Sequence, residues 1–143
     1  MKPTMVLFII GALVCCFGHM SAQQPQGNVF VVYTAERAFP EDGSSAEFDS
    51  LTQLYTERVT KKNELILSQR ICRHWWGSDN RQFVVIVEVK DWQAIEKAFA
   101  REDELFKNAF TKEEQDRFNK AYGRYFTGKH SDEIYTEVPG GRK

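Results

Sequence analysis

The side chains best suited to chemistry lie close together in residues 70–76, which hold two arginines, a cysteine, a histidine and two tryptophans. Alternation along an extended strand places Arg70, His74 and Trp76 on one face. Such a face suits an anionic or aromatic ligand, because a guanidinium gives charge-assisted hydrogen bonds, an indole stacks and an imidazole titrates near neutral pH. We therefore expect a ligand-binding site lined by Arg70, His74, Trp76, Tyr33 and His130.

The same residues have a structural interpretation. Adjacent tryptophans such as Trp75 and Trp76 can seal the edge of a core or a seam between subunits, with arginine stacked on them. Cys72 lies in a strand-like segment and is expected to be a small buried side chain rather than a reactive thiol. On this interpretation the chain is a structural or interaction domain without a pocket.

A metal site is the third possibility. His130 opens a run with Asp132 and Glu133, and these groups together with His74 have the ligand types of a transition-metal site. The spacing matches no known ligand pattern, and a His-Ser-Asp run is typical of a turn with local side-chain bonds. No feature supports a haem ligand, a Gly-x-Ser-x-Gly elbow or a glycine-rich phosphate loop. We expect neither a metal nor a cofactor.

The first 22 residues resemble a secretory signal. Lys2 precedes an uncharged apolar run over residues 5–17, and small residues near Ala22 suit cleavage. The run is shorter than the roughly 20 apolar residues of a membrane span. We expect an exported protein, periplasmic or extracellular, while a lipid anchor through Cys15 or Cys16 stays open. Residues 23–27 form a polar leader that we expect to be disordered.

Without residues 1–22 the chain has 143 − 22 = 121 residues, and losing Lys2 moves its formal net charge from −1 to −2. A balance so close to neutral argues against a nucleic-acid partner, which favours a basic surface. Cys72 is then the one remaining cysteine, so no disulfide forms within a chain. Stability must come from a hydrophobic core, supplemented by association with a second copy.

The hydrophobic pattern predicts one α+β domain over residues 28–138, followed by a flexible tail over residues 139–143. Two capping boxes, Ser44 to Glu47 and Thr111 to Glu114, and an N-cap at Asp91 mark helix starts. Their order is strand, helix, strand, strand, helix, short helix, strand, which is the split β-α-β arrangement of ferredoxin-like folds. The predicted strands cover residues 28–36, 65–76, 81–89 and 130–138, with a turn at 77–80.

The first predicted strand is apolar on both faces, while the strand at 81–89 has one fully apolar face and one mixed face. Phe83, Val85, Val87 and Val89 form the face that we assign to the helices. Phe30, Val32, Val84 and Ile86 are then left on the other, open face of the sheet. A second sheet from an identical subunit would cover them, so we expect a homodimer.

The element order, the length and the two-sided first strand resemble the dimeric α/β-barrel superfamily, in which two ferredoxin-like subunits close a barrel through their sheets. That superfamily includes cofactor-free quinone-forming monooxygenases, haem-binding and haem-degrading enzymes, chlorite-dismutase-like proteins and stress-related members without assigned activity. None of their catalytic signatures matches this sequence residue by residue. The resemblance supports the fold and leaves the function open. Our leading expectation is a secreted homodimeric binder of a small organic ligand, with its pocket between sheet and helices or inside the barrel. The alternative is a cofactor-free monooxygenase of phenolic or polycyclic substrates, with His74 as the base.

Overall fold

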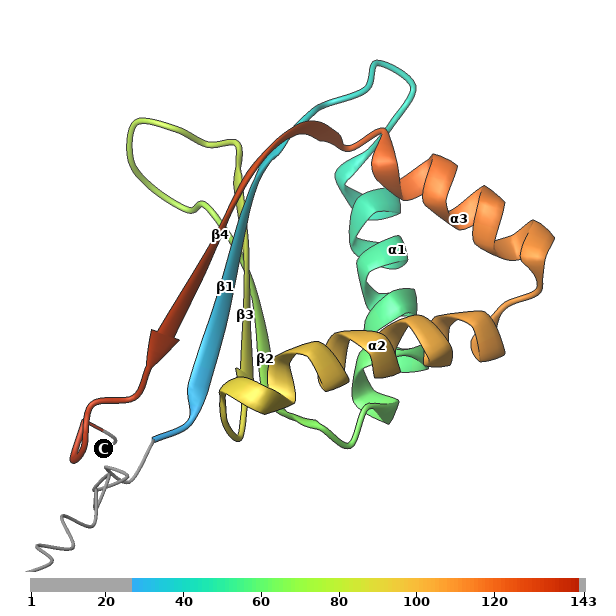
Figure 1. The fold of residues 1–143 in the computed structure, drawn as a ribbon. Helices are drawn as coiled ribbons and strands as arrows, with labels where there is room; N and C mark the ends of the chain where they lie inside the picture. Colours follow the sequence, from blue (N-terminus) through green and yellow to red (C-terminus); the bar gives the residue numbers. More distant parts are fainter. Residues whose placement is uncertain (1–26, 142–143) are drawn as a thin grey trace, which may run out of the picture.

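The computed structural model describes residues 27–141, so the predicted signal and most of the predicted leader lie outside the described residues. The chain has a ferredoxin-like α+β fold (Figure 1). Its elements are β1 (Val29–Arg37), α1 (Ser45–Arg58), a 3₁₀ helix η1 (Thr60–Lys62), β2 (Ile66–Arg73), β3 (Gln82–Val89), α2 (Trp92–Ala109), α3 (Lys112–Gly123) and β4 (Phe126–Thr136). The four strands form one antiparallel sheet in the order β2-β3-β1-β4.

The sheet carries all three helices on one side (Figure 1). Cross-strand pairs Val31–Val87, Tyr33–Val85 and Ala35–Phe83 share this face, because directly opposed residues of antiparallel strands point to the same side. The prediction that the Phe83–Val89 face meets the helices is confirmed. Two buried clusters result: Val29, Val31, Val87, Val89 and Ala98 in one, and Phe48, Phe83 and Tyr125 in the other.

The helices begin where their caps predict. Asp91 accepts a 2.9 Å hydrogen bond from the backbone N–H of Ala94, and Thr111 forms a complete capping box with Glu114. Each cap satisfies a backbone N–H that has no partner within its helix. These caps fix the directions of α2 and α3, the two helices at the front of the domain.

The capping box predicted at Ser44 is only half formed. The Ser44 hydroxyl accepts a hydrogen bond from the Glu47 N–H, but the Glu47 carboxylate turns away and accepts bonds from Tyr125 Oη at 2.6 Å and Arg124 Nη2 at 2.7 Å. The Tyr125 hydroxyl also accepts a 2.9 Å bond from the Ser44 N–H. A Cβ at Gly43 would lie 2.7 Å from this hydroxyl, so the close approach requires glycine. The start of α1 is thereby fastened to the end of α3.

The hairpin departs from the sequence prediction. β2 ends at Arg73, opposite Phe83, and residues 74–81 form a longer connection than the turn predicted at 77–80. Trp75 and Trp76 lie in this connection with 97% and 89% of their surfaces exposed, so they pack against no core within the chain. Cys72 is also exposed, on the open face of the sheet beside Val84, which corrects its predicted burial.

The last strand also differs from its predicted range of 130–138. β4 begins at Phe126 and ends at Thr136, because it pairs along the whole of β1, from Arg37–Phe126 to Val29–Thr136. The register shifts between Ala35 and Arg37, and Gly128 adopts a φ of 87° in that region. Glycine takes this left-handed conformation without steric cost, so an apparent bend in the sequence is part of the strand.

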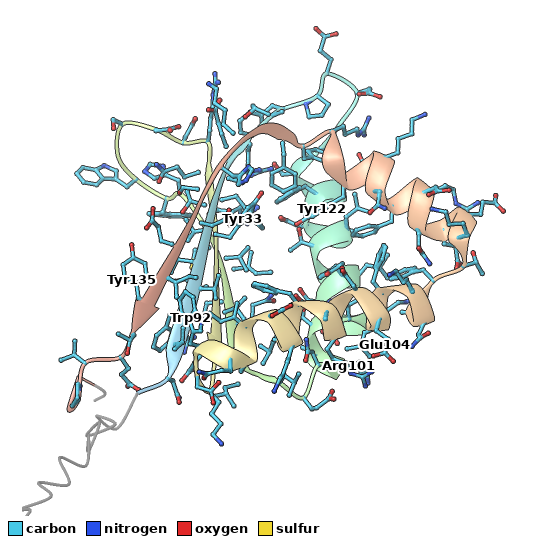
Figure 2. All side chains as sticks on the ribbon, viewed as in Figure 1. Tyr33, Trp92, Arg101, Glu104, Tyr122 and Tyr135 are labelled. Atoms are coloured by element: carbon cyan, nitrogen blue, oxygen red, sulfur yellow. The ribbon has the colours of Figure 1, made fainter. Side chains whose placement is uncertain are left out.

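The other face of the sheet is uncovered by any helix. Its central row runs Arg70–Ile86–Val32–Glu133 across the four strands, and Phe30, Val84 and Tyr135 lie on the same face. Figure 2 shows Tyr135 on the side of the sheet away from the helices. The predicted placement of Phe30, Val32, Val84 and Ile86 is confirmed. In the described part of the chain, no helix is both long and apolar enough to cross a membrane.

Candidate functional site

A pocket of about 550 Å³ lies between the sheet and the three helices. Figure 2 shows Tyr33 of β1 and Tyr122 of α3 on opposite sides of this space. Its wall on the sheet side is formed by Val31, Tyr33, Gln69, Ile71, Phe83, Val85, Val87, Phe126, Asp132 and Ile134. Its wall on the helix side is formed by Thr52, Tyr55, Thr56, Ile95, Phe99, Glu102, Phe118, Asn119 and Tyr122.

Aromatic rings dominate the pocket. Seven of its lining residues are phenylalanine or tyrosine. Three of those on the helices contact one another: the ring centroids of Tyr55 and Phe118 are 5.9 Å apart, and those of Phe118 and Tyr122 are 5.4 Å apart. Rings at these separations attract one another beyond the burial of their area. These three rings therefore form a packed aromatic layer on the helix side of the pocket, present before any ligand arrives.

Three tyrosine hydroxyls are among the polar groups on the walls, those of Tyr33, Tyr55 and Tyr122. Thr52 donates a hydrogen bond to Phe48 O at 2.9 Å, and its hydroxyl lies 3.2 Å from Tyr122 Oη. Burial raises the pKa of Tyr55, Tyr122 and Tyr33 above the ordinary tyrosine value, and the nearby carboxylate of Asp132 adds to the effect at Tyr33. All three phenols stay neutral at physiological pH and can donate or accept hydrogen bonds.

Glu102 is the most buried charged group on the walls. Its Oε1 accepts a 2.9 Å hydrogen bond from the buried hydroxyl of Thr60. Burial raises the pKa of Glu102, an effect that the Thr60 hydrogen bond opposes. The neighbouring Arg101 pairs instead with Glu64 and Glu104, and Figure 2 labels both Arg101 and Glu104 on α2. Within residues 27–141, no lysine, arginine or histidine forms an ion pair with Glu102.

The mouth of the pocket lies where its lining residues reach solvent. Phe99 of α2, Asn119 of α3, Ile71 of β2, and Asp132 and Ile134 of β4 are all exposed lining residues. A ligand would enter past such exposed residues and meet the less exposed Glu102 and Tyr55 further in.

The five residues expected to line one site do not gather there. Tyr33 lines the pocket, and the His130 ring lies beside it with centroids 5.6 Å apart. His130 itself is exposed and is not a lining residue; its Nε2 lies 3.6 Å from Asp132. Arg70 is exposed on the open face, while His74 and Trp76 follow the end of β2. The structure therefore does not bring these five residues together in one site. A binding role for each of them stays a prediction.

The two histidines lie toward opposite edges of the sheet. His130 is in β4, His74 follows β2, and β3 and β1 lie between those strands. Three strand spacings of about 4.8 Å separate the edges by roughly 14 Å. Within residues 27–141, no three histidine, cysteine or acidic side chains are close enough together to hold a metal ion. The two-histidine ligand set considered from the sequence is therefore not assembled.

Sequence reasoning missed Glu102, Tyr122 and Asn119, and it took the charges of the second helix for a solvated face. A signal was present in the spacing. Ile95, Phe99, Glu102 and Phe106 recur at intervals of four, three and four, so the carboxylate belongs to the inward stripe of α2. An acidic residue inside an apolar stripe marks a buried charge, which requires a partner or a function.

Comparison with known proteins concerns the fold. No protein-family model and no curated protein matches the chain. A candidate antibiotic biosynthesis monooxygenase from Caulobacter crescentus CB15 is 17% identical, with a TM-score of 0.52 over 80% of this chain and 92% of that one. The N63A mutant of SnoaB, a cofactor-independent oxygenase from Streptomyces nogalater, is 14% identical, with a TM-score of 0.50 over 77% and 92%.

A third solved structure extends this similarity. It is a candidate antibiotic biosynthesis monooxygenase from Bordetella bronchiseptica, 11% identical, with a TM-score of 0.54 over 79% of this chain and 99% of that one. Identities this low carry information on the fold alone. The element order, the sheet topology and these similarities together assign the chain a ferredoxin-like fold.

Proposed function

We propose that this chain is an exported homodimer that binds a small, largely apolar organic ligand between its sheet and its helices. The observation that carries the proposal is the pocket of about 550 Å³, lined mainly by apolar and aromatic side chains with a few polar groups. Ligand sites in proteins have this size and composition, roughly 300–1,000 Å³ with few placed polar groups. A chain that needed only a core would gain stability by filling such a volume.

A neutral fluorescent probe, N-phenyl-1-naphthylamine, tests ligand binding. Its emission rises when it leaves water, and we expect saturable binding of one molecule per chain. Asn119→Trp places a bulky ring at the mouth and should weaken binding at least about tenfold, a loss of roughly 1.4 kcal/mol. Lys120→Trp is the matched control, since it adds the same ring to the next residue of α3, which does not line the pocket. Absence of saturable binding, or equal binding by the two variants, would contradict the proposal.

The open face of the sheet supports the dimer. Its central row has Arg70 at the β2 edge, apolar Ile86 and Val32 in the middle, and Glu133 at the β4 edge. A twofold axis parallel to the strands would bring Arg70 against Glu133 of the partner subunit and stack the apolar centres. This arrangement covers apolar surface and pairs opposite charges at both rims, so a second copy of the chain fits the face.

A second candidate function is cofactor-free oxygenation. It is favoured by the similarity in fold to SnoaB, a cofactor-independent oxygenase. In such a reaction a substrate CH₂ and O₂ give a ketone and water, so the substrate supplies the electrons. The base would be Glu102 rather than His74, because Glu102 lines the pocket and His74 does not. Oxygen uptake with a panel of phenols and polycyclic ketones, lost in Glu102→Gln and kept in Asp103→Asn, would establish this activity; no uptake would leave a binding protein.

Export rests on the sequence of residues 1–22, with Lys2, the apolar run and the small residues near Ala22. Expression of the whole chain with its native start, followed by mass spectrometry of the secreted or periplasmic fraction, tests it. The measured mass is expected to match a mature chain that begins at Gln23. An uncleaved chain in the cytosol would contradict export without affecting the ligand pocket.

A further inference from the structure

The walls of the pocket carry an unbalanced charge. Two carboxylates, Glu102 and Asp132, line it, and no lysine, arginine or histidine does so. Asp132 already has a neighbour of potential positive charge in His130, 3.6 Å away at the mouth. Among residues 27–141, Glu102 has only the neutral hydroxyl of Thr60 as a hydrogen-bond partner. The inner part of the pocket therefore holds a negative group whose positive partner the described chain does not supply.

The aromatic walls also favour a positively charged ligand. Tyr33, Tyr55, Phe99, Phe118 and Tyr122 are among the seven rings around the space. The face of an aromatic ring is its negative side, so a cation placed over it is attracted, the more so where water is excluded. An anionic ligand would meet two carboxylates and ring faces, and no cation on the walls to balance it.

We infer that the ligand of this pocket is an amine, protonated at neutral pH, on an aromatic or apolar body, with Glu102 as its counter-ion. The inference rests on the proposed ligand-binding function and names the ligand class. The ammonium donates to the oxygen of Glu102 that Thr60 leaves open and lies near the Tyr55 hydroxyl, which makes no hydrogen bond within residues 27–141. The apolar body fills the space between Val85 on the sheet and Phe118 on α3.

Three probes of matched shape test the inference by calorimetry at neutral pH: 1-naphthylmethylamine, 1-naphthylmethanol and 1-naphthoate. They present a cation, a neutral hydroxyl and an anion on the same ring system. A hydrogen bond to a charged group in a desolvated site is expected to make the amine bind about tenfold or more tightly than the alcohol. The carboxylate should bind most weakly of the three.

Two variants test whether the charge of Glu102 causes the preference for the amine. Glu102→Gln keeps the shape and the acceptor for Thr60, and should reduce the ratio of amine to alcohol affinity to within about twofold of one. Asp103→Asn is the matched control, because it removes the same charge from the next residue of α2, which does not line the pocket. The control should preserve the preference for the amine.

The remaining outcomes contradict either the assigned ligand class or the ligand-binding function itself. Equal binding of amine and alcohol, tighter binding of the carboxylate, or an amine preference that survives Glu102→Gln overturns the assignment of ligand class. If N-phenyl-1-naphthylamine still binds in those cases, the pocket stands and only the class is wrong. If none of the four probes binds, the ligand-binding function fails and the amine inference fails with it.

Discussion

The hydroxyl of Thr60 donates a 2.9 Å hydrogen bond to Glu102, which joins the short helix η1 to the wall of the pocket. Nearby, Asn63 Nδ2 donates a 2.8 Å bond to Ala98 O. These two bonds tie the segment after α1 to the side of α2 that carries Glu102. The position of the carboxylate is therefore set by side chains about 40 residues earlier in the chain.

Replacing Thr60 with valine keeps the shape and removes the donor. Because the hydrogen bond lowers the pKa of Glu102, Thr60→Val should raise that pKa further. The lost bond to a partly desolvated carboxylate should lower the free energy of unfolding by about 1–2 kcal/mol. Titration of the Glu102 carboxyl by carbon NMR and urea unfolding measure the two effects. An unchanged pKa would show that the bond is absent in solution.

The pH dependence of stability should report Glu102 directly. A carboxyl whose folded pKa is raised binds more protons when folded than when unfolded, so stability falls as pH rises from the ordinary glutamate value of about 4.5 through the folded pKa. Glu102→Gln removes this loss and should be more stable than the parent at neutral pH, with the difference shrinking below about pH 4.5. Melting temperatures between pH 3.5 and 8 test this, and a constant difference would contradict it.

Tyr125 should be the most sensitive hydroxyl of the fold. Tyr125→Phe removes the donor to Glu47 and the acceptor of the Ser44 N–H, and should lower the free energy of unfolding by about 1–3 kcal/mol. The bonds from Tyr125 and Arg124 hold the pKa of Glu47 below its ordinary value, so that pKa should rise in the variant. The native contribution of Glu47 is present above its ordinary pKa and is lost as pH falls. Tyr135→Phe, at an exposed tyrosine, is the control.

Trp75 and Trp76 should contribute little to the stability of the chain. Both are almost fully exposed, so the double alanine variant should change the free energy of unfolding by no more than about 0.5 kcal/mol. Phe48→Ala, in the buried aromatic cluster, should cost about 3–5 kcal/mol by comparison. The part of the tryptophan emission that the double alanine variant loses should resemble that of hydrated indole, since Trp92 supplies the remainder. A strong blue shift lost on dilution would instead place these residues in a seam between subunits.

The proposed dimer should depend on the open face of the sheet. Ile86→Lys puts a charge in its centre, at a cost of at least about 3 kcal/mol, so the dissociation constant should rise at least about a hundredfold. Trp75→Lys, outside this face, is the control. Analytical ultracentrifugation reports both, and a monomeric parent or a dimeric Ile86→Lys protein would contradict the arrangement.

The charged residues at the two edges of the open sheet face should set the relative orientation of the two subunits in the dimer. Arg70→Glu should weaken the dimer by a factor of a few to about thirty, because an exposed pair contributes up to about 1 kcal/mol and twofold symmetry provides two. The double variant Arg70→Glu, Glu133→Arg should restore the association. Failure of the second change to restore it would mean that the two edges do not meet.

The sequence by itself determined the local features of this protein. Periodicity in residues 81–89 identified the face that packs on the helices, and the caps at Asp91 and Thr111 fixed where α2 and α3 begin, because both signals act over a few neighbouring residues. The apolar pattern also placed Val32 and Ile86 on the open face, since side chains alternate strictly along a strand.

Only the tertiary structure decided which side chains share a pocket. Tyr33 and Tyr122 face the same space although 89 residues separate them, and Glu102 joins them because η1 anchors α2 there. The cluster at residues 70–76 was prominent in the sequence, yet β2 stops at Arg73 and leaves Trp75 and Trp76 in solvent. Where a strand ends depends on its partner strand, and what a pocket contains depends on how sheet and helices pack. Neither is encoded in a short stretch of residues.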